Sequence, residues 1–179
     1  MKVLVTVATR HGSTQMIGEA LREELVATGV QAHLLEPELI ADLGGYDAVV
    51  IGSGVYAGRW LKPARKFVDR FEGQLQRMPV WLFSSGPIGD PAKPTQPPAD
   101  GLAIADRLRA MDHQVFEGRL ERDLLGITER AVTRMVGAAS GDYRPWVAIT
   151  VWARRISASL KTELPAKPEP AITTASGVR

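Results

Sequence analysis

The chain has 179 residues, no cysteine and a formal net charge of +2 at pH 7, and 45% of its residues are hydrophobic. This length predicts one domain with a substantial core, and the missing cysteine excludes disulfides, thiolate nucleophiles and cysteine-ligated metal sites. The charge, spread without a dense basic block, argues against a nucleic-acid partner. No apolar run reaches the ~18–20 residues of a membrane span, and no signal peptide precedes Val3, so we expect a cytoplasmic protein.

The first half of the chain predicts alternating strands and helices. Its opening run is continuously apolar, which is typical of a buried parallel strand. The helical pattern that follows ends before Gly29, a residue suited to the end of a helix. The expected elements are strands at residues 2–8, 30–35 and 47–51 and helices at about 13–28 and 61–73.

The second half continues the alternation and adds an extra segment. A proline-rich loop at 91–98 precedes the third helix, and an additional helical pattern at 124–136 precedes the last helix. Prolines and small residues from Thr162 onward predict a disordered tail. The expected elements are strands at 79–83 and from Val115 to about Leu120, and helices at about 99–111, with Leu102, Ala105, Leu108 and Met111 on one face, and at about 145–161.

Alternation of strands and helices, with strands rich in valine and isoleucine, predicts an α/β fold. The fold is a doubly wound, five-stranded parallel sheet with helices on both faces. A strand order of 2-1-3-4-5 would place the switch point between the first and third strands. Ligands of such sheets bind beyond the carboxyl ends of the strands. Three loops would therefore gather there, at residues 9–14, 52–60 and 84–90.

The turn after the first strand carries three hydroxyl side chains and one glycine. Thr9, Ser13 and Thr14 supply hydroxyl donors, and Gly12 lets the main chain approach a ligand closely. Because a helix starts at once, its N–H groups and positive dipole end add to these donors. We therefore predict a phosphate site. The alternative is that Ser13 only caps the helix, a role that needs one hydroxyl and not three.

The second and third loops are rich in glycine. Their main-chain N–H and C=O groups suit the polar edge of a flat ring, and together with the phosphate turn they suit a mononucleotide. Tyr56 and Trp60 could stack on such a ring. Alternatively, Trp60 packs in the core beside the helix that follows.

A different interpretation of residues 52–57 is a dinucleotide fingerprint. Gly-Ser-Gly-Val-Tyr-Ala fits the pattern G-x-G-x-x-A, and Glu72 follows roughly 20 residues later. The pattern follows the third strand, however, and the next helix begins too late, at Lys62. We therefore favour the mononucleotide site.

The sequence lacks the motifs that other catalytic chemistries require. Ser84 and Ser85 do not form a G-x-S-x-G elbow, and no Walker glycine–lysine pattern exists. The histidines at 11, 33 and 113 are isolated and lack metal-ligand spacing. We therefore predict neither a catalytic side chain nor a metal site, and His11 either hydrogen-bonds the phosphate or a substrate, or faces solvent.

Residues 8–14, Ala-Thr-Arg-His-Gly-Ser-Thr, resemble the FMN-phosphate loop of flavodoxins. They are most similar to the loop of menaquinone-dependent protoporphyrinogen oxidases, a flavodoxin-like family. Residues 49–58 resemble that family's second loop, and Phe83-Ser84 resembles the start of its third. The family also carries a helical insert where this chain has its additional helical pattern.

The resemblance implies a flavodoxin-like domain over residues 1–161, with an insert at about 119–141 and a tail at 162–179. It also implies FMN as the cofactor. The phosphate would be held by Thr9, Arg10, His11, Gly12, Ser13 and Thr14. The isoalloxazine ring would be flanked by Ser53, Gly54, Val55, Tyr56 and Gly58. Its other side would be lined by Ser84, Ser85 and Gly86.

The resemblance further implies an FMN-dependent oxidoreductase of haem biosynthesis. Such a flavoprotein passes hydride equivalents from protoporphyrinogen IX to the flavin and then to a quinone. Two departures fall where the substrate would be gripped: Val55 replaces the usual arginine beside the aromatic residue, and the third loop lacks the expected asparagine.

Two alternatives remain open beside the enzyme. One is a flavodoxin-type electron carrier between protein partners, and the other is an interaction module without flavin. Carriers usually steer their partners with a strongly acidic surface. The near-neutral charge of this chain and its insert favour the enzyme.

The amphipathic pattern of the insert predicts that its apolar face packs against another surface, and several surfaces are possible. Its amphipathic pattern with arginines suits a peripheral membrane contact that reaches a quinone. From Glu117 to Arg144, however, five arginines are balanced by five acidic residues, which weakens attraction to anionic lipids. The alternative is that its apolar face packs on the domain or on a second subunit in a homodimer.

Overall fold

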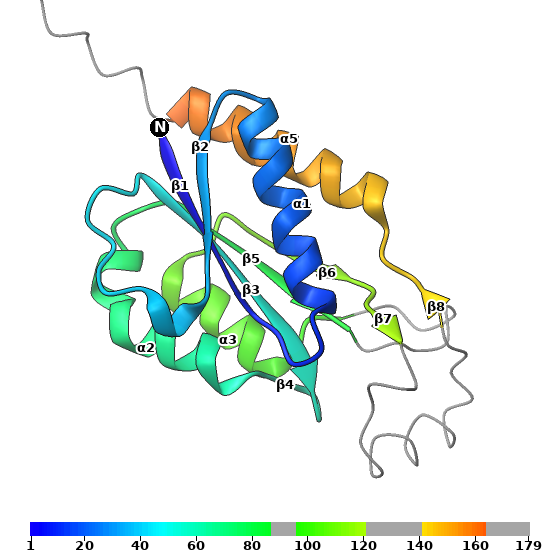
Figure 1. The fold of residues 1–179 in the computed structure, drawn as a ribbon. Coiled ribbons are helices and arrows are strands. Elements are labelled where there is room, and N and C mark those ends of the chain that lie inside the picture. Colours follow the sequence, from blue (N-terminus) through cyan, green and yellow to red (C-terminus); the bar gives the residue numbers. More distant parts are fainter. Residues whose placement is uncertain (87–95, 121–140, 164–179) are drawn as a thin grey trace, which may run out of the picture.

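A computed structural model describes residues 1–86, 96–120 and 141–163. Its centre is a parallel sheet with helices on both faces (Figure 1). The strands lie in the order β2-β1-β3-β5-β6, which confirms the predicted order 2-1-3-4-5 of five main strands. These strands are β1 (Lys2–Ala8), β2 (Gln31–Leu35), β3 (Ala48–Tyr56), β5 (Val80–Ser85) and β6 (Asp112–Phe116).

Two layers of helices cover the sheet (Figure 1). One layer holds α1 (Ser13–Ala27) and α5 (Trp146–Glu163), and the other holds α2 (Lys62–Leu75) and α3 (Ala99–Leu108). A short 3-10 helix, η1 (Pro37–Leu39), precedes β3.

The interior strand β1 contributes side chains to both layers because successive side chains of a strand point to opposite faces. Val3, Val5 and Val7 pack toward α1 and α5, whereas Leu4 and Ala8 pack toward α2 and α3. Burying one valine or leucine contributes about 1.5–3 kcal/mol. The continuous apolar run of β1 is therefore explained by burial on both faces.

The strand β3 is longer than the sequence suggests. It was expected to end at Ile51, yet it pairs with β5 through Gly52, Ser53 and Gly54. A Cβ atom on Gly52 would lie 2.1 Å from the Phe83 ring, so the missing side chain makes room for that ring. The glycines here serve packing inside a strand, and the prediction of a loop over 52–60 was wrong.

A tight hairpin follows β3. Ala57 and Gly58 have φ angles of 48° and 70°, and β4 (Arg59–Trp60) returns antiparallel to β3. Two consecutive residues in the left-handed region match the two-residue turn that suits the twist of a hairpin. This geometry also excludes the dinucleotide interpretation, because the G-x-G-x-x-A pattern lies in a strand and hairpin and not at the start of a helix.

The fifth main strand lies earlier than predicted. β6 ends at Phe116, and the chain then leaves the sheet. β7 (Arg119–Leu120) pairs instead with β8 (Gly141–Asp142) in a separate two-stranded antiparallel ribbon. We call β7 and β8 the ribbon. The predicted insert begins and ends in it, and the expected helix at 124–136 lies outside the described residues.

Two helix predictions need correction. The residues Leu102 and Met111 were expected on the buried face of the third helix but are 52% and 46% exposed. The helix ends at Leu108, and its buried positions are Gly101, Ile104 and Leu108. The last helix continues through residues 162 and 163, which were assigned to the tail. The remaining tail, 164–179, lies outside the described residues.

Candidate functional site

The carboxyl ends of β1, β3 and β5 lie at one edge of the sheet (Figure 1). The chain passes from β1 through α1 to β2, which lies on one side of β1, whereas β3 lies on the other side of β1. This is the switch point at which doubly wound sheets bind their ligands. The turn at 9–12, the hairpin at 56–59 and Gly86 therefore belong to the same end of the molecule.

The turn after β1 closes on itself. Gly12, with a φ angle of 80°, donates its N–H to Thr9 Oγ1 at 3.1 Å. Gly12 precedes the first residue of α1, and no side chain caps this helix. The interpretation of Ser13 as the cap was therefore wrong: its Oγ accepts a hydrogen bond from the Arg119 N–H at 2.9 Å.

The first turn of α1 offers hydrogen-bond donors. The N–H groups of Ser13, Thr14 and Gln15 have no acceptor among the described residues. The hydroxyl oxygens of Thr9 and Ser13 each accept a main-chain N–H, which leaves both O–H groups able to donate. This donor set fits an anion at the positive end of the helix.

Neighbouring residues keep the space beside these donors suitable for a phosphate. A Cβ atom on Gly54 would lie 3.2 Å from Thr14 Oγ1, so the glycine leaves that hydroxyl uncrowded. Residues 9–14 contain no acidic side chain. The residues present therefore fit the phosphate of FMN.

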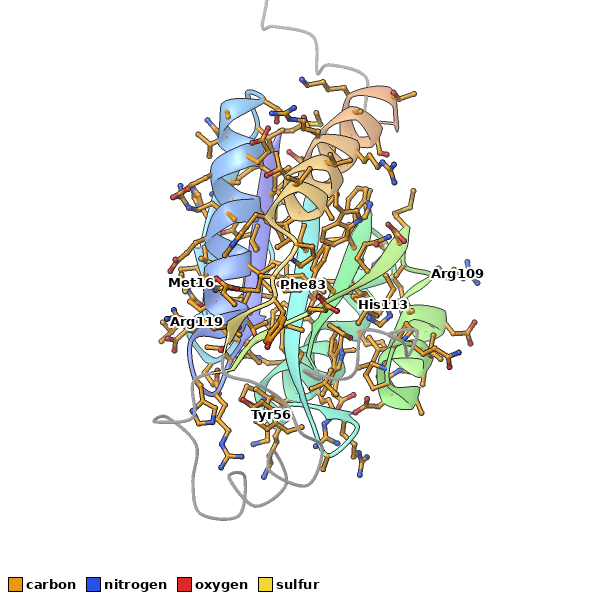
Figure 2. All side chains as sticks on the ribbon, turned by 90° about the vertical axis from the view of Figure 1, so that its right-hand side faces the viewer. Met16, Tyr56, Phe83, Arg109, His113 and Arg119 are labelled. Carbon is orange, nitrogen blue, oxygen red and sulfur yellow. The ribbon has the colours of Figure 1, made fainter. Side chains whose placement is uncertain are left out.

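The phosphate turn also contacts the hairpin. The Arg10 guanidinium lies 5.3 Å from the centroid of the Tyr56 ring, and the His11 ring lies 6.0 Å from it. Arg59 is the register partner of Tyr56, and directly opposite residues of an antiparallel pair point to the same face. Tyr56 lies at the end of the sheet in Figure 2. The predicted phosphate and ring regions are thus joined through one aromatic side chain.

Two predicted ring-lining serines point elsewhere. The hydroxyl of Ser53 donates to Gly54 O and accepts the Leu61 N–H, each at 2.9 Å. The hydroxyl of Ser84 accepts the indole N–H of Trp60 at 2.8 Å. Both serines are fully buried, so their side chains help to build the core and do not line an open ring site.

The core alternative for Trp60 is confirmed, because this residue is only 2% exposed. The ring region accordingly offers Tyr56, Val55 and the main chain of the strand ends. Gly86 has a φ angle of 86° and donates its N–H to Phe116 O at 3.0 Å. Which of the predicted ring residues touch a flavin stays a prediction.

His113 is a site feature that sequence reasoning left without a role. Its Nε2 lies 2.9 Å from Ser84 Oγ, and its ring meets Trp60 edge-on at 5.9 Å. Burial lowers the pKa of His113, and the neighbouring Asp112 carboxylate opposes this shift. The imidazole is therefore neutral at pH 7 and belongs to the packing beneath the ring region.

The ribbon supplies a second missed feature, the buried Arg144. This residue follows β8, and its guanidinium forms a close pair with Asp142 beside the first turn of α1. No sequence signal distinguishes Arg144 from the other arginines near the insert. Within the described residues, no helix is long and apolar enough to cross a membrane. The membrane and homodimer predictions rest on the insert and stay predictions.

Comparison with known proteins places these features in a family. Residues 4–144 match the profile of the Flavodoxin domain family. The chain is 26% identical over 161 residues to protoporphyrinogen IX dehydrogenase (quinone) of Escherichia coli strain K12, and the alignment covers 85% of this chain and 89% of that protein.

Solved structures show the same fold. A flavodoxin variant from Pseudomonas aeruginosa has a TM-score of 0.58 and 13% identity, covering 90% of this chain and 99% of that one. The rubredoxin oxygen:oxidoreductase of Desulfovibrio gigas has a TM-score of 0.62 and 16% identity, covering 92% of this chain but only 37% of that one.

Proposed function

The chain belongs to the Flavodoxin domain family, and we propose that it binds FMN and acts as an FMN-dependent oxidoreductase. The observation that carries this proposal is the first turn of α1, which presents N–H and hydroxyl donors without a side-chain cap and contains no acidic residue. Its hydroxyls would hold the phosphate, and Tyr56 would form one wall of the ring region. FMN, when bound, supplies the electron transfer, so no acid or base side chain is required.

We propose a porphyrinogen-type substrate and a quinone acceptor for this flavoprotein. The relationship to the E. coli dehydrogenase supports both, at 26% identity. The Arg10 guanidinium, which lies over the Tyr56 ring, supports a substrate that carries carboxylates, as porphyrinogens do. Arg59 is the register partner of Tyr56, the residue next to Val55, where the family's arginine is missing; its Nε lies 3.9 Å from the Asp100 carboxylate.

The test of FMN binding is direct. Purified protein should be yellow, show an FMN spectrum and contain FMN in 1:1 proportion. Colourless protein that rejects added FMN would overturn the proposal and favour an interaction module.

The test of the substrate uses the loaded protein without oxygen. Protoporphyrinogen should bleach the flavin absorbance, and menaquinone should then restore it. Bleaching by a flavodoxin reductase alone, with none by the porphyrinogen, would favour the electron carrier and would leave FMN binding intact.

A further inference from the structure

Arg144 is buried at the base of the insert, with a side chain that is 1% exposed. Its Nε and Nη2 atoms donate to the two carboxylate oxygens of Asp142 at 2.7 and 2.6 Å. Its guanidinium also lies 4.4 Å from the centroid of the Trp146 ring. A buried guanidinium needs such partners because losing its water is costly. These contacts fix the orientation of the side chain.

The remaining edge of this guanidinium faces α1. Nη1 lies 3.4 Å from Ser13 O and 3.0 Å from Met16 Sδ. Figure 2 shows Met16 and Arg119 at the same end of this helix. Arg144 therefore reaches the turn in which we place the phosphate of FMN.

Ser13 is held by the ribbon on both its side chain and its main chain. The Arg119 N–H donates to Ser13 Oγ, and the Arg144 guanidinium donates to Ser13 O. A hydroxyl oxygen that accepts from one direction directs its own proton elsewhere. The ribbon thus orients the Ser13 O–H and keeps it available as a donor.

The position of Arg144 also matters electrostatically. A cation beside the positive end of a helix dipole is unfavourable unless an anion is close. Asp142 neutralises Arg144, and the hydrogen bonds from Arg144 hold the pKa of Asp142 below its usual range. The dipole end of α1 itself is left without an acidic partner in its first turn. A bound phosphate would supply that charge.

We propose that Arg144 is a positioning residue for the phosphate end of the cofactor site, acting through Ser13. This inference rests on the proposed function, because it needs FMN phosphate at the first turn of α1. It predicts that Arg144 contributes to the binding of FMN but not to the binding of riboflavin, which has the same ring and no phosphate.

The test compares the dissociation constants of FMN and riboflavin, measured by quenching of flavin fluorescence. Arg144→Met should weaken FMN binding about tenfold or more, the size of one charge-assisted hydrogen bond. Riboflavin binding should change less than about twofold, because this ligand makes no phosphate contact. Equal weakening of both ligands would show a general structural role and would overturn the inference.

Two further variants separate positioning from charge. Arg144→Lys keeps the charge but loses the two-pronged geometry, so it should restore only part of the FMN affinity. Full rescue by lysine would overturn positioning. Arg144→Met and Ser13→Ala should be non-additive in FMN affinity, because Arg144 holds the main chain of Ser13 and so acts through the residue that carries the hydroxyl. Additive effects would contradict the route through Ser13.

Arg107→Met is the matched control, because Arg107 also pairs with carboxylates, Glu72 and Asp69, on α2. Its preference for FMN over riboflavin should equal that of the wild type. If Arg144→Met does not fold, the lysine variant and Ser13→Ala decide the question. Wild-type protein that binds no FMN would overturn the proposed function itself, whereas binding with unchanged ligand preference in the variants would overturn this inference alone.

Discussion

At the scale of single residues, the phosphate turn depends on hydroxyl groups with distinct partners. Thr9 closes the turn through Gly12, and Thr14 stands beside Gly54. Replacing either threonine by alanine should weaken FMN binding, at about 1.5–3 kcal/mol for each lost charge-assisted hydrogen bond. Isothermal titration measures this change.

The control for these substitutions is Thr28→Ala. Thr28 lies just after the last residue of α1 and donates to Leu25 O at 2.8 Å. The Thr28→Ala substitution should lower the stability of the fold slightly and leave the affinity for FMN unchanged. If the Thr9 and Thr14 variants bind FMN as tightly as the wild type, the phosphate lies elsewhere.

His113 predicts a pH dependence of stability. Because burial lowers its pKa in the folded state, the unfolded chain binds the proton more readily. Its contribution is therefore fully present above the unfolded pKa of about 6.5, and stability falls as the pH drops below that value. Urea unfolding at pH 7.5 and pH 5 should show a smaller loss for His113→Gln than for the wild type.

The same measurement on His33→Gln gives the comparison. His33 is exposed on β2, where its Nδ1 lies 3.2 Å from the Tyr46 hydroxyl, so this variant replaces a histidine without disturbing the core. A His113→Gln variant with the wild-type pH dependence would show that this imidazole does not titrate differently on folding.

At the scale of elements, the end of β3 depends on a missing side chain. Gly52→Ala would place a methyl group against the Phe83 ring, and overpacking of this kind costs about 1–3 kcal/mol. Thermal unfolding should show a lower Tm. Gly73→Ala is the control: a Cβ atom on Gly73, in α2, would lie 3.9 Å from Arg77 Nη2, an ordinary contact, and alanine there should stabilise by roughly 0.5–1 kcal/mol. A harmless Gly52→Ala would contradict the assigned packing.

The sequence allowed the elements and their order to be predicted because buried parallel strands are continuous apolar runs. Prediction from the sequence failed where one local pattern is compatible with two different structures. Gly52-Ser53-Gly54 has the composition of a loop, but its place in β3 depends on Phe83, a residue of another strand. The buried face of α3 was misassigned for a similar reason, since Gly101 packs against Trp60 and His113.

At the scale of the whole molecule, FMN should stabilise the folded state by mass action. A ligand at 100 times its dissociation constant adds about 2.7 kcal/mol, which corresponds to a rise in Tm of about 5–10 °C for a domain of this size. Differential scanning calorimetry with and without FMN measures the shift. Riboflavin at the same concentration should give a smaller rise in Tm. An unchanged Tm in saturating FMN would argue against a site in the folded domain.

The candidate site likewise has one part formed by consecutive residues and another part formed by residues that are far apart in the sequence. The phosphate turn could be predicted because Thr9 to Thr14 are consecutive and hydroxyl-rich. Arg144 could not, because it meets Ser13, 131 positions earlier in the sequence, only after the chain has folded. The core roles of Ser53 and Ser84 also depend on partners from other elements.

The ribbon has a consequence for how this chain can be rebuilt. Leu120 and Gly141 are register partners, so the two ends of the intervening segment are already held side by side. A two-residue turn such as Asn-Gly can join paired antiparallel strands directly, and shortening a loop lowers the entropy lost on closing it. We therefore expect that the segment between Leu120 and Gly141 can be removed or replaced while Arg119 and Arg144 keep their hydrogen bonds with Ser13.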